Sequence, residues 1–355
     1  MPRFSLIVPV YNAQKYLGEC LDSLLSQSLS DFEIICVNDG SQDGSQSILE
    51  AYAARDERIT LISQHNQGVC VARNVGLAAA TGEIVLFIDS DDGLVPEALS
   101  KLSSEFASSG AQVITFGLLP SDMEAVPQSL RHELCPRDIT YDGFKPALLF
   151  KEYSHPYACR TAVVRSLLVS EHLGFEPGVR LGEDQIFQFV LYPLAAKTVL
   201  MSDALYMYRM NEDSVTHEDT SSAESLLIAK LEQHYLVEET IVREWNSRGF
   251  MSLAKEELLE WLIDFILLDT AKLSSCNQQL FFSRFVALAQ EGFGPNWESV
   301  LSRYPARRVA KKICAYVDTS SEAPALSLVD KGLFYVMRRG LYRCLERVVM
   351  KITSR

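Results

Sequence analysis

Short, continuous apolar runs recur along the first third of the chain, separated by stretches with helical periodicity. Five of these runs are typical of strands that are covered on both faces: residues 4–10, 32–39, 59–64, 82–89 and 111–117. Helices are predicted between them at about 14–27, 44–55, 68–80 and 96–109. Because strand and helix alternate at this spacing, we expect right-handed crossovers and an α/β fold with a mostly parallel sheet.

The pattern changes in the second half of the chain. After Ser221 it is helical up to about residue 290, and the Gly/Pro-rich stretch "EGFGPNW" then interrupts it. We therefore predict a sheet domain over residues 1–220, with halves at 1–110 and 111–220. A helical extension (221–330) and a separate C-terminal helix (331–355) are expected to follow it.

The ends of the predicted strands are polar. They read "PVYN" (9–12), "NDGSQDGS" (38–45), "QHNQGVCVARN" (64–74) and "DSDD" (89–92). Ligands of parallel α/β sheets bind beyond the carboxyl ends of the strands. The sequence therefore predicts a binding site along this edge of the sheet.

Composition narrows the function. The 355 residues are 48% hydrophobic and carry a formal charge of −13, which argues against general nucleic-acid binding because phosphate contacts need a basic surface. Eight scattered cysteines, without a CxxC pair, indicate the reduced core residues of a cytoplasmic protein. No run reaches the roughly 18 apolar residues of a membrane span. We expect a protein that is soluble or held on a membrane surface.

The segment "DSDD" places three carboxylates, Asp89, Asp91 and Asp92, within four positions. They repel one another, and burial would force protonation unless a cation offsets the charge. Oxygen ligands at a strand end suit Mg²⁺ or Mn²⁺ shared with substrate phosphates. The alternative is a capping role ahead of the helix near Pro96.

Three stretches together resemble the family 2 glycosyltransferases of the GT-A fold: "SLIVPVYNAQKYLGECLDSLLSQSLSDFEIICVNDGSQDGS", "HNQGVCVARNVGLAAATGEIVLFIDSDD" and "GEDQIF". The resemblance is specific over residues 4–95, good to about 217 and absent from the last third of the chain. It implies a UDP-sugar donor, a divalent metal (Mn²⁺ or Mg²⁺) and transfer of a hexose or N-acetylhexosamine with inversion. The acceptor it implies is a glycan or lipid-linked hydroxyl in bacterial cell-surface polysaccharide synthesis.

The resemblance also implies roles for the aspartates. Asp91, the second aspartate of the DxD pattern, is expected to bind the metal, with Asp89 near the metal or the ribose and Asp92 supporting. A metal that bridges the diphosphate oxygens would stabilise the charge of the leaving group. Asp39 is expected to accept a hydrogen bond from the uracil N–H; alternatively, it forms the turn before Gly40.

Other donor contacts follow from the same resemblance. Pro9, Tyr11 and Asn12 lie where the family stacks on the base and makes backbone contacts. Arg73, in "ARN", is expected to face the donor from the start of a helix. Its alternative is a surface ion pair. His217, which closes "YRMNEDSVTH", is a candidate metal ligand, although an exposed loop histidine explains it equally well.

Catalysis needs a base, because the acceptor hydroxyl must lose its proton as it attacks. Asp184 and Glu183 in "LGEDQIFQF" match the acidic pair of the family, so Asp184 is predicted to be the base and Glu183 its neighbour. The alternative is helix capping, since carboxylates are favourable at a helix N-terminus.

The tail repeats basic residues every four positions from Arg339 to Arg355, with Leu341, Leu345, Val348 and Ile352 between them. A basic amphipathic helix suits an anionic membrane surface, which would place the protein peripherally on the inner face of the plasma membrane. A helix docked on the acidic body of the protein itself is the alternative.

Three other classes of protein compete with this interpretation. A nucleotidyltransferase would have a Gly-rich basic loop after the first strand, which "PVYNAQKY" lacks, and a dinucleotide oxidoreductase would have GxGxxG. A catalytically inactive relic that serves as a binding or scaffold subunit is the non-enzymatic alternative. The sequence identifies neither the sugar nor the acceptor.

Overall fold

The computed structural model describes residues 1–123, 126, 134–152, 154, 157–210, 224–319 and 326–340. The chain divides into two compact units, residues 1–217 and 218–355. Each unit is described by itself.

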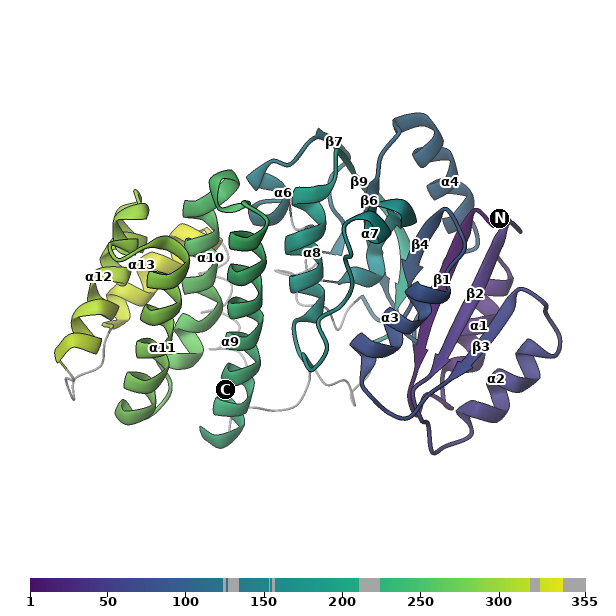
Figure 1. Cartoon of the computed structure of the whole chain (residues 1–355), viewed down its shortest axis with the longest axis horizontal. Helices are drawn as coiled ribbons and strands as arrows, with labels where there is room; N and C mark the ends of the chain where they lie inside the picture. The colour runs from purple at the N-terminus through teal and green to yellow at the C-terminus, as the bar shows by residue number, and fades with distance from the viewer. Residues whose placement is uncertain are drawn as a thin grey trace. The chain divides into compact units, whose positions relative to one another are not determined.

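The first unit is built on a nine-stranded sheet within the described residues (Figure 1). The strands are β1 (Phe4–Val10), β2 (Phe32–Asn38), β3 (Ile59–Ser63), β4 (Ile84–Phe87), β5 (Gly93–Leu94), β6 (Val113–Pro120), β7 (Ile139–Asp142), β8 (Thr161–Val164) and β9 (Lys197–Tyr208). Their order is β3-β2-β1-β4-β8-β6-β9-β5, and β7 also pairs with β9.

Most strands run in one direction. Strands β1 to β4 are mutually parallel, and β6 and β9 are parallel to each other. Strand β8 is antiparallel to both β4 and β6, so the two groups point the same way, whereas β5, β7 and β8 oppose them. The predicted mostly parallel sheet is therefore confirmed. The fifth predicted strand forms β6, but β8 lies between it and β4.

Helices cover the sheet as the continuous apolar runs predict. The first four are α1 (Leu17–Leu25), α2 (Ser45–Ala53), α3 (Val69–Ala79) and α4 (Ala98–Ser109), each within its predicted range. Further helical elements follow: α6 (Pro146–Phe150), the 3-10 turn η1 (Ala158–Arg160), α7 (Arg165–Ser170) and α8 (Glu183–Leu194).

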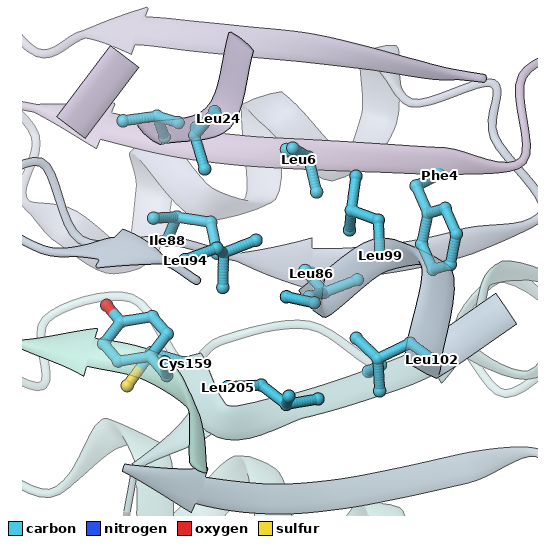
Figure 2. Close-up of a cluster of buried hydrophobic side chains, with 14 of the residues drawn as sticks. Phe4, Leu6, Leu24, Leu86, Ile88, Leu94, Leu99, Leu102, Cys159 and Leu205 are labelled. Atoms are coloured by element: carbon cyan, nitrogen blue, oxygen red, sulfur yellow. The ribbon is translucent and has the colours of Figure 1, made fainter. Parts of the chain in front are cut away.

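The core explains why the strands are apolar on both faces. On one face, Phe4 and Leu6 of β1 pack in a cluster with Leu24 of α1 and with Leu99 and Leu102 of α4 (Figure 2). On the other face α3 approaches β1 so closely that a Cβ on Gly76 would lie 2.4 Å from Ile7 Cγ2. Burial on both faces removes the alternation seen in strands with one wet face.

The second unit is helical, as predicted. Its helices are α9 (Glu224–Ser247), α10 (Met251–Thr270), α11 (Ser275–Phe293), α12 (Tyr304–Thr319) and α13 (Leu328–Arg339), with the 3-10 turn η3 (Trp297–Val300). Gly294, with φ 97°, ends α11 within the predicted Gly/Pro-rich break. No helix among the described residues is long and apolar enough to cross a membrane.

Candidate active site

The aspartates of "DSDD" lie in a tight turn that follows β4. Ile88 donates a last ladder hydrogen bond to Ile7 O (2.9 Å), and the Asp92 N–H donates to Asp89 O (3.0 Å). The chain then enters β5 and pairs with β9. The turn therefore places the carboxylates beyond the carboxyl end of a central strand.

Arg73 of α3 connects this turn to the acidic pair of α8. Its Nη2 lies 2.9 Å from Asp89 Oδ1, and its Nη1 lies 3.0 Å from Glu183 Oε1 and 3.3 Å from Asp184 Oδ1. The Arg73 side chain is only 4% exposed. Three predicted site residues thus meet at the buried cation of a fourth, Arg73, and these ion pairs are not surface pairs.

Asp184 has an unusual pKa for a carboxyl group. Burial raises the pKa of Asp184 to about 7, and the negative charges of Glu183 and Asp89 add to the rise. The positive charge of Arg73 and a hydrogen bond from the Ala158 N–H oppose it. A carboxylate that titrates near neutral pH is suited to accept a proton in a reaction. Its role as the base stays a prediction.

Asp92 is buried, and its partners lie on β9 and directly after it. Its Oδ2 accepts from the Tyr206 hydroxyl (2.7 Å) and its Oδ1 from the Arg209 N–H (2.7 Å). Tyr206 Oη also accepts from the Asp89 N–H (3.1 Å). Burial and the nearby charge of Asp89 raise the pKa of Asp92 to about 8. These contacts are those of a residue that supports the turn.

Asp39 follows β2 and is buried. It accepts from Gln64 Nε2 (2.7 Å), from the Gln67 N–H (2.9 Å) and from the Gly68 N–H (2.8 Å). A carboxylate has roughly four acceptor sites, so about one remains for a further donor. Gly40, with φ 75°, turns the chain directly after it. Asp39 therefore organises the loop, and contact with uracil stays a prediction.

Strands β1 and β4 separate near the carboxyl end of β1. Pairing with β4 ends at Ile7, so Pro9, which has no N–H to donate, lies where the two strands have parted. Tyr11 is 50% exposed beyond it. Asn12, at φ 50°, donates its N–H to Ser41 Oγ (3.1 Å) and accepts from the Gln42 N–H at Oδ1 (2.8 Å). Asn12 thus joins two strand-end loops; its donor contact stays a prediction.

Comparison with known proteins identifies the family. Residues 5–169 match the profile described as "Glycosyl transferase family 2". The "Uncharacterized glycosyltransferase EpsJ" of Bacillus subtilis (strain 168) is 32% identical over 266 residues, which cover 73% of this chain and 74% of EpsJ. The chain belongs to glycosyltransferase family 2.

Two further relatives of this family 2 glycosyltransferase show how far the likeness extends. The "Poly(ribitol-phosphate) beta-N-acetylglucosaminyltransferase TarS" of Staphylococcus aureus (strain Mu50 / ATCC 700699) is 31% identical over 226 residues, or 63% of this chain and 38% of TarS. The "Putative glycosyltransferase EpsH" of Bacillus subtilis (strain 168) is 33% identical over 60% of this chain and 62% of EpsH.

A solved structure extends the likeness in fold to almost the whole chain. The crystal structure of S. aureus TarS 1–349 in complex with UDP-GlcNAc superposes with a TM-score of 0.67 at 22% identity, covering 95% of this chain and 92% of that one. The predicted GT-A fold with a helical C-terminal region is confirmed.

The carboxylates of the turn suit a metal shared with a substrate. Within the described residues, no group of three or more His, Cys, Asp or Glu side chains could hold a metal ion by itself. A Mg²⁺ or Mn²⁺ ion that is also bound by a diphosphate needs only one or two protein carboxylates. Asp89, which is 34% exposed, and the half-buried Asp91 would supply these carboxylates, and their role as metal ligands stays a prediction. His217 lies outside the described residues.

The structure adds residues to the site that the sequence did not reveal. Arg209 donates from Nε to Asp91 O (2.9 Å), and its guanidinium lies 4.5 Å from the ring centre of Tyr16. Together with Tyr206 it fastens the turn of residues 89–92 to β9. Arg209 lies in the quoted segment "YRMNEDSVTH", but the role of neither residue can be read from the sequence, because their partners are more than a hundred positions away.

Proposed function

We propose that this glycosyltransferase transfers a hexose or N-acetylhexosamine with inversion from a UDP-sugar to a hydroxyl of a glycan or lipid-linked acceptor in cell-surface polysaccharide synthesis. The observation that carries the proposal is the shared cation, since Arg73 joins Asp184 to Asp89. Inversion needs a base on one side of the sugar and a diphosphate-binding turn on the other. Arg73 holds the proposed base, Asp184, and a carboxylate of the turn, Asp89, on its two terminal nitrogens.

The chemistry assigns a role to each side chain. The acceptor oxygen attacks the anomeric carbon while Asp184 Oδ takes its proton, and the bond from that carbon to the diphosphate oxygen breaks. A bound divalent ion, held by Asp91 and Asp89, would stabilise the charge of the leaving diphosphate. The negative charge of Glu183 beside Asp184 favours the protonated form of the base after transfer.

The donor follows from two further observations. Asp39 retains an acceptor site at the end of β2, where the family accepts from the uracil N–H. The TarS structure was solved with UDP-GlcNAc, and relatives are named for poly(ribitol-phosphate) acceptors, which supports a UDP-sugar and a glycan-type acceptor here. A scaffold subunit without activity would have no reason to keep Asp89, Glu183 and Asp184 around the buried Arg73.

The deciding experiment measures UDP affinity by calorimetry with Mn²⁺ and with EDTA, followed by UDP release from a panel of UDP-sugars. We expect binding to need the metal, because a diphosphate is repelled by the aspartates alone. Asp91→Ala should weaken UDP binding at least about tenfold, the loss of roughly one charge-assisted contact. Asp142→Ala removes an exposed carboxylate of β7 and is the matched control. Equal affinity in EDTA contradicts the metal assignment.

We further propose that the basic C-terminal segment, residues 331–355, binds an anionic membrane surface on the cytoplasmic side. One face of α13, the helix in which this segment begins, supports the proposal, whereas Arg338 on the same helix pairs with Glu260 and Asp264 of α10. Leu328, Val329 and Leu333 of α13 are 84%, 66% and 46% exposed. Arg308 and Lys312 of α12 lie beside them, since both pair with Asp330. Exposed apolar residues bordered by cations are typical of an interfacial helix.

A further inference from the structure

We propose that Arg73 is a positioning residue, which fixes the carboxylate of Asp184 relative to that of Asp89. The inference rests on the proposed function, in which these two carboxylates serve opposite sides of the reacting sugar. It replaces a direct contact with the donor, the role that the family resemblance implies for Arg73.

The guanidinium bridges the two sides through different nitrogens. Nη2 bonds Asp89 Oδ1 at 2.9 Å, while Nη1 serves Glu183 and Asp184 at 3.0 and 3.3 Å. Because the guanidinium is planar and rigid, its two ends hold their partners at a fixed separation, which the single ammonium of a lysine cannot do. With only 4% of its side chain exposed, Arg73 also offers a donor little surface to contact.

An aromatic cluster holds the guanidinium in place. Arg73 lies 4.8 Å from the ring centre of Phe175. Phe175 stacks on Phe187 of α8 (4.6 Å, 6°) and meets the edge of Phe87 of β4 (4.9 Å, 86°). Phe87 precedes Asp89 by two positions and Phe187 follows Asp184 by three. The cluster therefore joins the same two elements that Arg73 joins.

Neighbouring residues of α3 fasten the segment that leads into α8. Asn74 donates from Nδ2 to Phe175 O (2.7 Å) and accepts from the Phe175 N–H at Oδ1 (2.8 Å). A Cβ on Gly174 would lie 2.7 Å from Asn74 Oδ1, so the segment fits closely. Cys70, one turn earlier, donates from Sγ to Val179 O (3.3 Å). One face of α3 thus anchors residues 174–184 at three points.

Charge makes the arrangement depend on Arg73. One guanidinium faces the three carboxylates of Asp89, Glu183 and Asp184. Without it, the three would repel one another in a largely buried space and would separate. Loss of Arg73 should therefore displace the base and raise the pH at which it ionises.

The test compares Arg73→Lys and Arg73→Met with Arg58→Met. Arg58 is a matched control, since it also donates two hydrogen bonds to a carboxylate (Asp56) and lies over a phenylalanine ring (Phe32). It lies at the amino end of β3, away from the carboxyl strand ends that form the candidate site. For Arg73→Met we expect kcat to fall about a hundredfold, the effect of a misplaced reacting group, with KM and UDP affinity within about threefold. Arg73→Lys should recover part of kcat, and the acidic limb of the kcat–pH profile should move upward in Arg73→Met.

A second measurement does not depend on turnover. In a hydrogen-exchange measurement, the amides of residues 175–186 should exchange about tenfold faster in Arg73→Met than in wild type. Their exchange rates in Arg58→Met should equal those of wild type. Asn74→Ala removes the clamp on Phe175 without changing any charge, and should reproduce this effect if Arg73→Met fails to fold. If wild type releases UDP from no UDP-sugar, the proposed function is wrong, and the exchange result still decides the role of Arg73.

Two results would overturn the inference. A raised KM and weaker UDP binding at unchanged kcat in Arg73→Met would make Arg73 a donor contact. Unchanged exchange of residues 175–186 in both Arg73→Met and Asn74→Ala would show that α3 does not position the base.

Discussion

A carboxyl group works as a base near neutral pH only where its surroundings oppose ionisation, and Asp184 is such a group. Burial and the charges of Glu183 and Asp89 raise its pKa to about 7. We predict that Asp184→Asn, which nearly preserves shape, lowers kcat about a hundredfold or more. UDP-sugar binding by calorimetry should stay close to wild type. Turnover within a few fold of wild type would refute the assignment.

The pH dependence follows from the same shift. Below a pH of about 7 Asp184 holds its proton and cannot accept another, so kcat should fall as the pH is lowered through this range. Glu183→Gln removes one of the charges that raises the pKa of Asp184. It should move the acidic limb of the profile to lower pH and reduce kcat less than Asp184→Asn.

The predicted preference for a uracil nucleotide depends on Asp39. Its remaining acceptor site favours a ring N–H that uracil offers and a purine does not offer in the same place. We expect UDP to compete at least about ten times better than GDP or ADP, the value of roughly one hydrogen bond to a charged group. Asp39→Asn should erase that preference, measured by competition calorimetry.

Asp43 supplies the control for Asp39. It lies in the same loop and accepts from the Gln14 N–H (2.9 Å) and the Ser45 N–H (3.0 Å). Asp43→Asn should therefore disturb the loop while keeping the ratio of UDP to GDP affinity. If GDP competes as well as UDP with the wild-type protein, Asp39 does not read the base.

At the level of elements, the turn after β4 depends on β9. Asp92 accepts from Tyr206 and from the Arg209 N–H, and Tyr206 accepts from the Asp89 N–H. Asp92→Ala leaves these donors unpaired, so UDP affinity with Mn²⁺ should fall about tenfold, or roughly 1.4 kcal/mol. Asp92→Asn keeps an acceptor for the Arg209 N–H and should lose much less. Equal losses in the two variants would mean that the charge of Asp92 matters and not its support of the turn.

The same elements show what a sequence can and cannot reveal. Strands β1, β2 and β3 are continuous apolar runs because helices cover both faces, and that pattern is visible in the chain itself. Strand β8 has four residues and β5 has two, which is too short for any periodicity. Their antiparallel pairing is set by contacts with β4, β6 and β9, which lie far along the chain.

The site follows the same division. "DSDD" and "GEDQ" were found as local clusters of carboxylates with a matching family pattern. That Arg73 would join them could not be read from the sequence, because Asp89 lies 16 positions and Asp184 111 positions away. The sequence alone therefore predicts a donor contact for Arg73, whereas the structure shows its three carboxylate partners, which come together only in the folded protein.

At the scale of the whole molecule, charge is distributed unevenly. The chain carries −13 overall, yet basic residues accumulate from Arg303 onward. An acidic protein is repelled by an anionic bilayer unless a local basic surface faces it. The C-terminal unit provides such a surface next to the exposed apolar residues of α13.

We predict that the protein sediments with anionic liposomes and that both parts of this surface contribute. Each basic residue near such a bilayer adds about 1 kcal/mol, and less as salt increases. Removal of residues 340–355 should therefore weaken sedimentation, most clearly at low salt. Replacing Leu328, Val329 and Leu333 together by Ser should weaken it at all salt concentrations, because burial of apolar surface is not screened. Leu280→Ser, at a 61% exposed leucine of α11, is the control. Sedimentation that neither change reduces would mean that the C-terminal segment does not bind the membrane.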